Sequence, residues 1–273
     1  MESAENDGRD FDWGPAGGQL ESIRSMRETR NIMGMPISLT VLDAGVRRQD
    51  LEAVFEEFSA VDEQFSPFKS GSEISRFNRG EITEVEVTPR LREIFALCER
   101  TKRETGGYFD ITRPDGTVDP CGMVKGWAIK NAARQLVDFG YSDFCVAAGG
   151  DVQCHGVNEE GRAWTVGICN PFSRDEIVKV LEPKGFGVAT SGNYIRGDHI
   201  YDPHTGRYGS DNIVSLTVMG PDILEADRYA TAAFAMGRQG IHFIERMPGL
   251  EGYEIDGSGT ARMTSGLKSF LPC

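Results

Sequence analysis

Asp227 and Thr231 stand four residues apart in the segment from Asp222 to Gly237, DILEADRYATAAFAMG. The segment reads as a helix, because Asp222 with Glu225 three residues later resembles a capping box and Gly237 can end the helix. Side chains four residues apart lie on the same helix face, so this helix would present a carboxylate and a hydroxyl together. That pair suits a hard cation such as Mg²⁺, which takes few protein ligands and keeps water or phosphate oxygens. The alternative is an alanine-rich core helix with a solvated aspartate.

A second segment, DPCGMVKG from Asp119 to Gly126, carries groups that favour phosphate. Gly122 and Gly126 allow the backbone to approach a ligand closely, and Lys125 places a positive charge where a helix begins. Helix N-termini and lysine both bind phosphate groups well. The glycine spacing is not that of a P-loop, and glycine turns before helices are common. Taken alone, the segment is therefore weak evidence for a nucleotide site.

Four further segments combine glycine with polar or aromatic side chains: SPFKSGSEISRFN at 66–78, GGYFD at 106–110, AGGD at 148–151 and ATSGNYIRGDHIYDPHTG at 189–206. Phe68 offers an aromatic face to a flat ligand, and Ser72 can cap a short helix. His199, close to Asp202, can hold or move a proton near neutral pH. Each feature has a structural alternative, because aromatic residues beside glycine turns usually pack in a core and Asp-Pro or Thr-Gly steps commonly form turns.

Composition limits the class of protein. The chain has 273 residues, enough for a core that needs neither disulfides nor a metal to fold. Its net charge of −13 disfavours general binding to nucleic acid or to anionic membranes. No apolar run of about 18 residues is present, so we expect no transmembrane helix and no membrane insertion. The six cysteines form no C-x-x-C pair, and buried reduced thiols are the favoured interpretation.

The beginning of the chain differs in composition from the rest. It is acidic and rich in glycine, and it lacks the basic and apolar regions of a secretory signal. We therefore expect residues 1–30 to be a disordered or loosely attached leader and residues 31–273 to be a single domain. We also expect a cytoplasmic location.

The hydrophobic pattern predicts helices over 50–64, 88–105, 125–139 and 222–236. Strand-like runs cover 33–42, 144–148, 152–155, 164–169, 178–181, 187–191 and 213–219, with short pieces near 252–255 and 267–270. Helices and strands do not alternate regularly. This order favours an α+β fold, with mixed or antiparallel sheets and packed helices, over a doubly wound parallel sheet.

Taken in order, the motifs SEISRFN, GGYFD, DPCGMVKGWA, AGGD, TSGNY followed by HIYDPHTG, and ADRYATAAFAMG resemble those of the ApbE family, the FAD:protein FMN transferases. The resemblance runs from about Met33 to the C-terminus. It implies an ApbE-like (T-fold-like) domain and Mg²⁺-dependent transfer of FMN from FAD to a Thr or Ser hydroxyl of an acceptor flavoprotein, with release of AMP. Some members of the family also hydrolyse FAD to FMN and AMP.

The resemblance also implies roles for individual residues. Mg²⁺ would be bound by Asp227, Thr231 and the backbone carbonyl of Gly122. The flavin nucleotide would be lined by Met33, Phe68, Tyr108, Phe109, Asp110, Asp119, Lys125 and Ile200. His199 is the candidate for assisting the attacking hydroxyl.

The sequence departs from the family at several places. Phe68 stands where the family usually has tyrosine, and an RPDG turn between Asp110 and Asp119 replaces a sizeable insertion of longer members. The segment 256–262, DGSGTAR, is interpreted as a β-turn and not as a flavinylation site. Two alternatives to the transferase are a FAD pyrophosphatase, which would release FMN and AMP without an acceptor, and a non-catalytic flavin-binding carrier.

Overall fold

The computed structural model describes residues 25–193, 200–209 and 212–272. Its centre is an eight-stranded sheet in the order β1-β2-β3-β4-β7-β10-β11-β12, in which neighbouring strands pair antiparallel. The strands are β1 (Met26–Ile32), β2 (Met35–Val41), β3 (Phe144–Ala148), β4 (Asp151–His155), β7 (Gly187–Gly192), β10 (Ile213–Gly220), β11 (Glu251–Asp256) and β12 (Ala261–Met263). β4 is thus joined in space to β7 and not to the hairpin that follows it in sequence.

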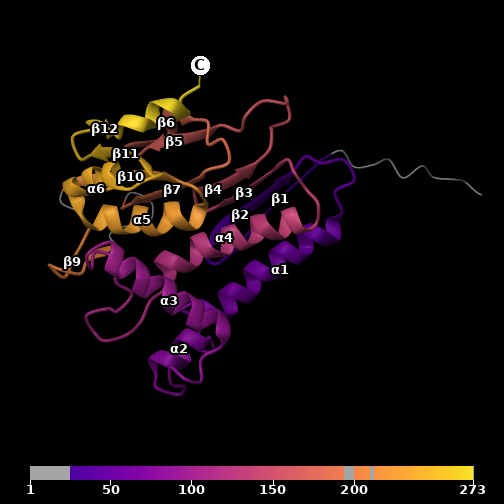
Figure 1. Ribbon diagram of the computed structural model, residues 1–273. Coiled ribbons are helices and arrows are strands. Elements are labelled where there is room, and N and C mark those ends of the chain that lie inside the picture. The colour runs from indigo at the N-terminus through magenta and orange to yellow at the C-terminus, as the bar shows by residue number, and fades with distance from the viewer. Residues whose placement is uncertain (1–24, 194–199, 210–211, 273) are drawn as a thin grey trace, which may run out of the picture.

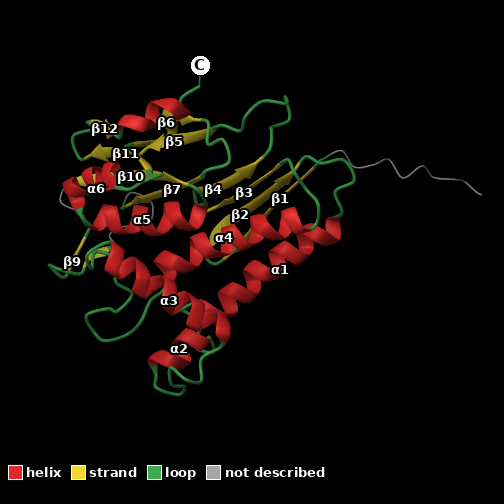
Figure 2. Cartoon of the chain, viewed as in Figure 1, coloured by secondary structure: helices red, strands yellow, loops and turns green. Residues whose placement is uncertain are grey.

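Helices cover one face of this sheet (Figures 1 and 2). They are α1 (Arg48–Phe65), α2 (Glu73–Asn78), α3 (Pro89–Glu104), α4 (Cys121–Asp138), α5 (Ile223–Ala235) and α6 (Gly240–Arg246), with a short 3₁₀ turn, η1 (Gly237–Gln239), between the last two. α1, α4 and α5 lie nearest the sheet, whereas α2 and α3 lie farther out in Figure 2. The helices and the sheet together enclose the main apolar core.

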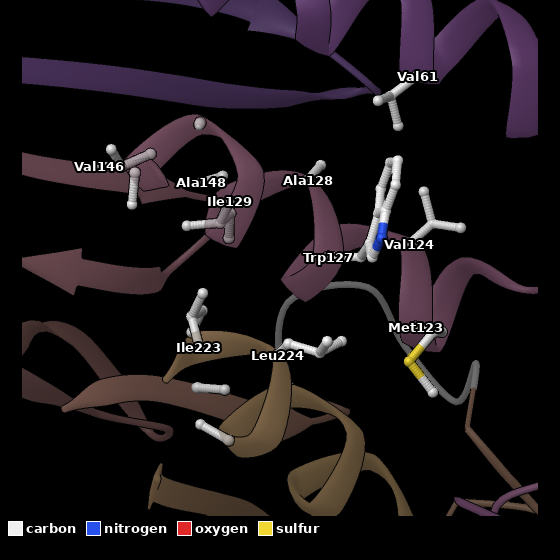
Figure 3. Packing of buried hydrophobic residues seen from close by; sticks show 14 of the residues in the cluster. Val61, Met123, Val124, Trp127, Ala128, Ile129, Val146, Ala148, Ile223 and Leu224 are labelled. Carbon is white, nitrogen blue, oxygen red and sulfur yellow. The ribbon is translucent and has the colours of Figure 1, made fainter. Parts of the chain in front are cut away.

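α4 is the helix at the centre of that core. Trp127 reaches toward Val61 of α1, while Ile223 and Leu224 of α5 lie on the opposite side of α4 (Figure 3). The Trp127 ring also meets Phe65 edge to face, with 5.9 Å between ring centroids. α4 is therefore fixed from both sides, which matters because its first turn faces the site described below.

A smaller apolar cluster lies on the other face of the sheet. There the hairpin of β5 (Val166–Asn170) and β6 (Ser173–Leu181) and the 3₁₀ helix η2 (Ser265–Phe270) pack on β7, β10 and β11. A separate two-stranded hairpin, β8 (Tyr201–Asp202) with β9 (Arg207–Tyr208), projects beside α3 (Figure 1). Within the described ranges, no helix combines the length and the apolar composition that a membrane crossing requires.

The α+β expectation with antiparallel sheets is confirmed, and the helix predicted over 88–105 is found at Pro89–Glu104, with Thr88 as its N-cap. The beginning of the sheet differs. A single strand over 33–42 was expected, but Met33 and Gly34, both at positive φ, form a turn that joins two strands. β1 begins at Met26, so the last five residues assigned to the leader belong to the sheet. β1 is a polar edge strand that is held by backbone pairing to β2, and such a strand leaves no hydrophobic pattern to find.

The C-terminal region also differs from the expectation. The segment near 267–270 is a 3₁₀ helix and not a strand, with Leu267 as its buried residue. α6 was not expected, because its two buried isoleucines, Ile241 and Ile244, are too few to give a clear helical period. The DGSGTAR segment is confirmed as a turn, and it connects β11 to β12.

Candidate functional site

A cavity of about 750 Å³ lies where the ends of several sheet strands meet the first turn of α4 and one face of α5. This volume is in the usual range for small-molecule sites. Apart from His199, every site residue named from the sequence lines this cavity: Met33, Phe68, Tyr108, Phe109, Asp110, Asp119, Gly122, Lys125, Ile200, Asp227 and Thr231. His199 lies outside the described residues. Motifs spread over two hundred positions of the chain thus converge on one cavity.

α4 and α5 approach each other closely at the floor of the cavity. A Cβ placed on Gly126 would lie 2.8 Å from Cβ of Asp227 and 3.0 Å from the carbonyl oxygen of Ile223. A Cβ placed on Gly122 would lie 3.3 Å from the methyl group of Thr231. Gly126 is therefore required for this contact, and Gly122 lets Thr231 pack closely on α4, so the backbone of α4 lies next to the Asp-Thr pair of α5.

Replacing Gly126 with alanine is expected to lower the free energy of unfolding by about 2 kcal/mol. The added methyl group would be too close to α5, and this destabilisation exceeds the stabilisation that the higher helix propensity of alanine provides. Chemical denaturation of the two proteins measures this. Gly71→Ala is the matched control, since no atom of the described residues lies within 4 Å of a Cβ at that position and its backbone is not in the left-handed region. Equal stability of Gly126→Ala and the wild type would show that the α4–α5 contact is looser than described.

Asp227 is buried, with 2% of its surface exposed. Its Oδ2 accepts a hydrogen bond of 2.8 Å from the Gly126 N–H, and its Oδ1 lies 3.4 Å from the Lys125 ammonium. Burial raises the pKa of Asp227 to about 7, which Lys125 opposes and the neighbouring Asp151 reinforces. Without a further positive charge, the carboxylate form is thus poorly stabilised at this position.

This pKa leads to a pH dependence of stability in the metal-free protein. Folding raises the pKa of Asp227 from its ordinary 3.8 to about 7, so between these values the folded state holds a proton that the unfolded state does not. The contribution of Asp227 to the free energy of unfolding is therefore fully present below pH 3.8, and it is lost as the pH rises through 7. In excess chelator, Asp227→Asn should match the wild type near pH 4 and melt roughly 5 °C higher near pH 8. A constant difference across this range would contradict the assignment.

The oxygen donors at the floor fit a hard divalent cation. The carboxylate of Asp227 and the hydroxyl of Thr231 lie one helical turn apart on α5, where Thr231 packs against Gly122 and Asp227 packs against Gly126. Within the described ranges, no group of three His, Cys, Asp or Glu side chains could hold a metal. A cation here must therefore use a hydroxyl, a backbone carbonyl and outside oxygens, which is the pattern of Mg²⁺ and not of zinc.

The mouth of the cavity is aromatic. Phe68 is 87% exposed on a loop that is closed by a 2.7 Å hydrogen bond from the Ser72 hydroxyl to the Ser66 carbonyl. Tyr108 packs on the His204 ring with 4.4 Å between centroids, and so joins the GGYFD segment to the segment that contains β8. An exposed ring beside a deep polar floor suits a ligand with a flat apolar part and a charged part.

The short connection between Asp110 and Asp119 forms one wall. Its RPDG turn is confirmed, since Gly116 N–H donates to the Arg113 carbonyl at 2.9 Å. Asn78 of α2 binds both backbone groups of Val118, at 2.8 and 2.9 Å. The two acidic groups of the wall that line the cavity are paired, Asp110 with Lys102 and Asp119 with Arg113. Pairing reduces the repulsion that these carboxylates would exert on an anionic ligand.

The arrangement can be compared with known proteins. The chain matches the family model described as "ApbE family" over residues 33–115 and 112–253. It belongs to the ApbE family. A curated relative, the FAD:protein FMN transferase of Escherichia coli K12, is 34% identical over 176 residues, which cover 60% of this chain and 50% of that protein. The chain therefore matches about half the length of this relative. The protein of the same name from Vibrio cholerae is 25% identical over 256 residues, covering 73% of this chain and 76% of that protein.

Two solved structures share the ApbE-family fold. The flavin transferase ApbE from Vibrio cholerae has a TM-score of 0.80 at 23% identity, covering 90% of this chain and 99% of that chain. The ApbE protein of Thermotoga maritima has a TM-score of 0.81 at 21% identity, covering 91% and 100%. At 21–23% sequence identity, this structural similarity shows that the fold is shared.

Four charged residues of this ApbE-family site were missing from the set named from the sequence, and one of them, Asp62 of α1, lines the cavity. Lys69 and Arg113 line the cavity, but a lysine in a serine-rich loop and an arginine in a turn have the same signal as ordinary surface cations. Asp151 forms a 2.6 Å ion pair with Lys125. Its signal was present in the AGGD motif, where an acid directly follows a glycine pair and an apolar strand.

Proposed function

We propose that this protein is a Mg²⁺-dependent FAD:protein FMN transferase that moves FMN from FAD to a Thr or Ser hydroxyl of an acceptor flavoprotein and releases AMP. The observation that carries the proposal is the convergence of Lys125, Asp227, Thr231 and the Gly122 backbone at the floor of one cavity whose mouth holds Phe68. The family membership and the names of the relatives support the same activity.

The charges of the site agree with this substrate. A protein of net charge −13 repels a pyrophosphate unless positive charge is supplied locally. Lys125, one turn into α4, supplies one such charge, and the helix N-terminus at Cys121 adds partial positive charge. A bound Mg²⁺ would supply the remainder by neutralising charge on the phosphate oxygens.

In the proposed reaction, the acceptor hydroxyl oxygen forms a bond to the phosphorus of the FMN half, and the bond from that phosphorus to the bridging oxygen breaks. AMP leaves with the bridging oxygen, and the hydroxyl proton is released. The residues of this chain bind and orient the reactants, because phosphoryl transfer depends mainly on positioning and charge neutralisation. The proposed ring contact of Phe68 would hold the flavin, and Lys125 would face the phosphates. His199 as the group that receives the proton is a proposal from the sequence alone.

The test is to incubate the protein with FAD, Mg²⁺ and a peptide that carries a Thr or Ser acceptor motif, and to measure the peptide mass and the AMP released. We expect a fluorescent peptide that is heavier by one FMN group and an equal amount of AMP. AMP release that is unchanged by the peptide would favour the pyrophosphatase. Tight FAD binding without AMP under all conditions would favour the carrier. Either of these last two results would overturn the proposed function.

A further inference from the structure

Asp151 is a buried acid that the proposed reaction does not use. It is the first residue of β4, directly after Gly149 and Gly150, both at positive φ, which make the tight turn from β3. Its side chain has no exposed surface. Burying a carboxylate destabilises the folded state unless the charge is paired, so the partners of Asp151 need to be identified.

The two oxygens of Asp151 have different surroundings. Oδ1 accepts a 3.1 Å hydrogen bond from the Thr190 N–H of β7, just beyond the point where the β4–β7 pairing ends at Val188. Oδ2 is buried and has no aligned hydrogen-bond donor among the described residues, but it lies 2.6 Å from the Lys125 ammonium. One oxygen thus anchors the carboxylate to the sheet, and the other faces a residue of the cavity.

Lys125 therefore stands between two buried carboxylates. Its ammonium is 2.6 Å from Asp151 and 3.4 Å from Asp227. If Asp151 did not hold the ammonium, the nearest remaining anion would be Asp227, and a direct ion pair there would compete with a metal for the same carboxylate. When Asp227 is deprotonated, the three side chains together carry one net negative charge, which favours binding of a divalent cation.

We propose that Asp151 is a positioning residue, which holds the Lys125 ammonium off Asp227 so that Asp227 can bind a divalent cation while Lys125 faces the phosphates. The inference rests on the proposed function for the identity of the phosphates. The predicted competition between Lys125 and the cation for Asp227 does not depend on the proposed function, because it can be measured in the protein without substrate.

The experiment is a double-mutant cycle on cation binding, with Asp151→Asn, Lys125→Met and the double variant, and with Mn²⁺ alone as the probe. Asparagine keeps the shape of the side chain and an oxygen that can accept from Thr190, so the sheet anchor is retained. Free Mn²⁺ measured by electron paramagnetic resonance gives the affinity without any turnover. We expect Asp151→Asn to weaken Mn²⁺ binding about tenfold when Lys125 is present, and by less than about threefold when residue 125 is methionine. The difference between these two losses of Mn²⁺ affinity measures the part of the Asp151 effect that depends on Lys125.

Asp50→Asn is the matched control. Asp50 is also a buried aspartate, paired with Arg47 and Tyr141, but it does not line the cavity. Its replacement should lower the melting temperature without changing Mn²⁺ affinity. Equal Mn²⁺ losses from Asp151→Asn in both backgrounds, or no loss in either, would overturn the positioning role.

A kinetic readout separates this inference from the proposed function. If the wild type transfers FMN, Asp151→Asn should raise the Mg²⁺ concentration needed for half-maximal rate more than it raises the KM for FAD, and the double variant should be no slower than Lys125→Met alone. If the wild type transfers nothing, the proposed function fails, but the Mn²⁺ cycle still decides the role of Asp151.

Discussion

Replacing Asp227 with asparagine is expected to lower the rate of FMN transfer by about 10²–10³-fold, while FAD binding without metal changes little. The amide keeps an oxygen that can accept the Gly126 N–H, so the contact between α4 and α5 should persist. What is lost is the one carboxylate in the proposed donor set with Thr231 and the Gly122 carbonyl. Without it, the negative charge on the phosphates is less well neutralised in the transition state.

The control for this prediction is Asp222→Asn, on the same helix. Asp222 caps α5 and pairs with Lys130 at 2.6 Å, but it does not line the cavity. Asparagine is also a good cap, so transfer should stay within about twofold of the wild type. The measurement is the initial rate of AMP release at saturating FAD, Mg²⁺ and acceptor. Comparable rates for Asp227→Asn and Asp222→Asn would remove Asp227 from the mechanism.

The second large effect is on stability, and it concerns Arg228, the neighbour of Asp227 on α5. Arg228 is 2% exposed, and its guanidinium donates to Glu104 of α3 and to Glu225, each at 2.5 Å. It also donates to the Thr101 hydroxyl at 3.0 Å. The bonds to Glu104 and Thr101 tie α5 to α3. Removing the cation takes this partner from Glu225 and leaves Glu104 with only Arg100 and Tyr229, so Arg228→Met should cost about 3 kcal/mol of unfolding free energy.

The pH dependence identifies the cause of that loss. Burial tends to raise the pKa of Glu104, but hydrogen bonds from Arg228, Arg100 and Tyr229 outweigh it and lower the pKa to about 2. A lowered pKa stabilises the fold above the ordinary value near 4.5, and this contribution is lost as pH falls toward 2. Arg228→Met should therefore be most destabilising at neutral pH and less so near pH 3, as measured by urea denaturation.

Arg134→Met is the comparison for Arg228. The Arg134 side chain is 80% exposed and lies 3.9 Å from Asp138, so its loss should cost less than about 0.5 kcal/mol. If Arg228→Met were as mild as Arg134→Met, the α3–α5 link would not contribute to holding the site.

The sequence predicts the parts of the fold that have a strong local signal. The helix over 88–105 has a threonine cap, a proline in its first turn and apolar residues at helical spacing, and it was predicted within a residue. β1 was missed because Arg27, Glu28, Thr29 and Arg30 owe their place to backbone pairing with β2, which no local pattern encodes. The 3₁₀ helix at Ser265–Phe270 was mistaken for a strand because Leu267 and Phe270 give the same short apolar run in either state.

In the site, too, the residues with a local sequence signal could be predicted, and the contacts that depend on tertiary packing could not. Helical spacing placed Asp227 and Thr231 on one helix face but left an alanine-rich core helix as the alternative, and the glycines near Lys125 were weak evidence alone. The family resemblance was needed to assign both to a site. The pairing of Asp151 with Lys125 could not be predicted, because it depends on the tertiary packing of β4 against α4. The wall formed by the RPDG turn likewise depends on Asn78, forty residues away, which clamps Val118.

The most direct test of the whole account is a crystal structure of the protein with FAD and Mn²⁺, in which anomalous scattering locates the metal. The account predicts a Mn²⁺ peak bound by the Asp227 carboxylate, the Thr231 hydroxyl and the Gly122 carbonyl, in contact with the phosphates of a flavin whose ring lies against Phe68. A metal peak elsewhere, or a dinucleotide bound outside this cavity, would contradict it.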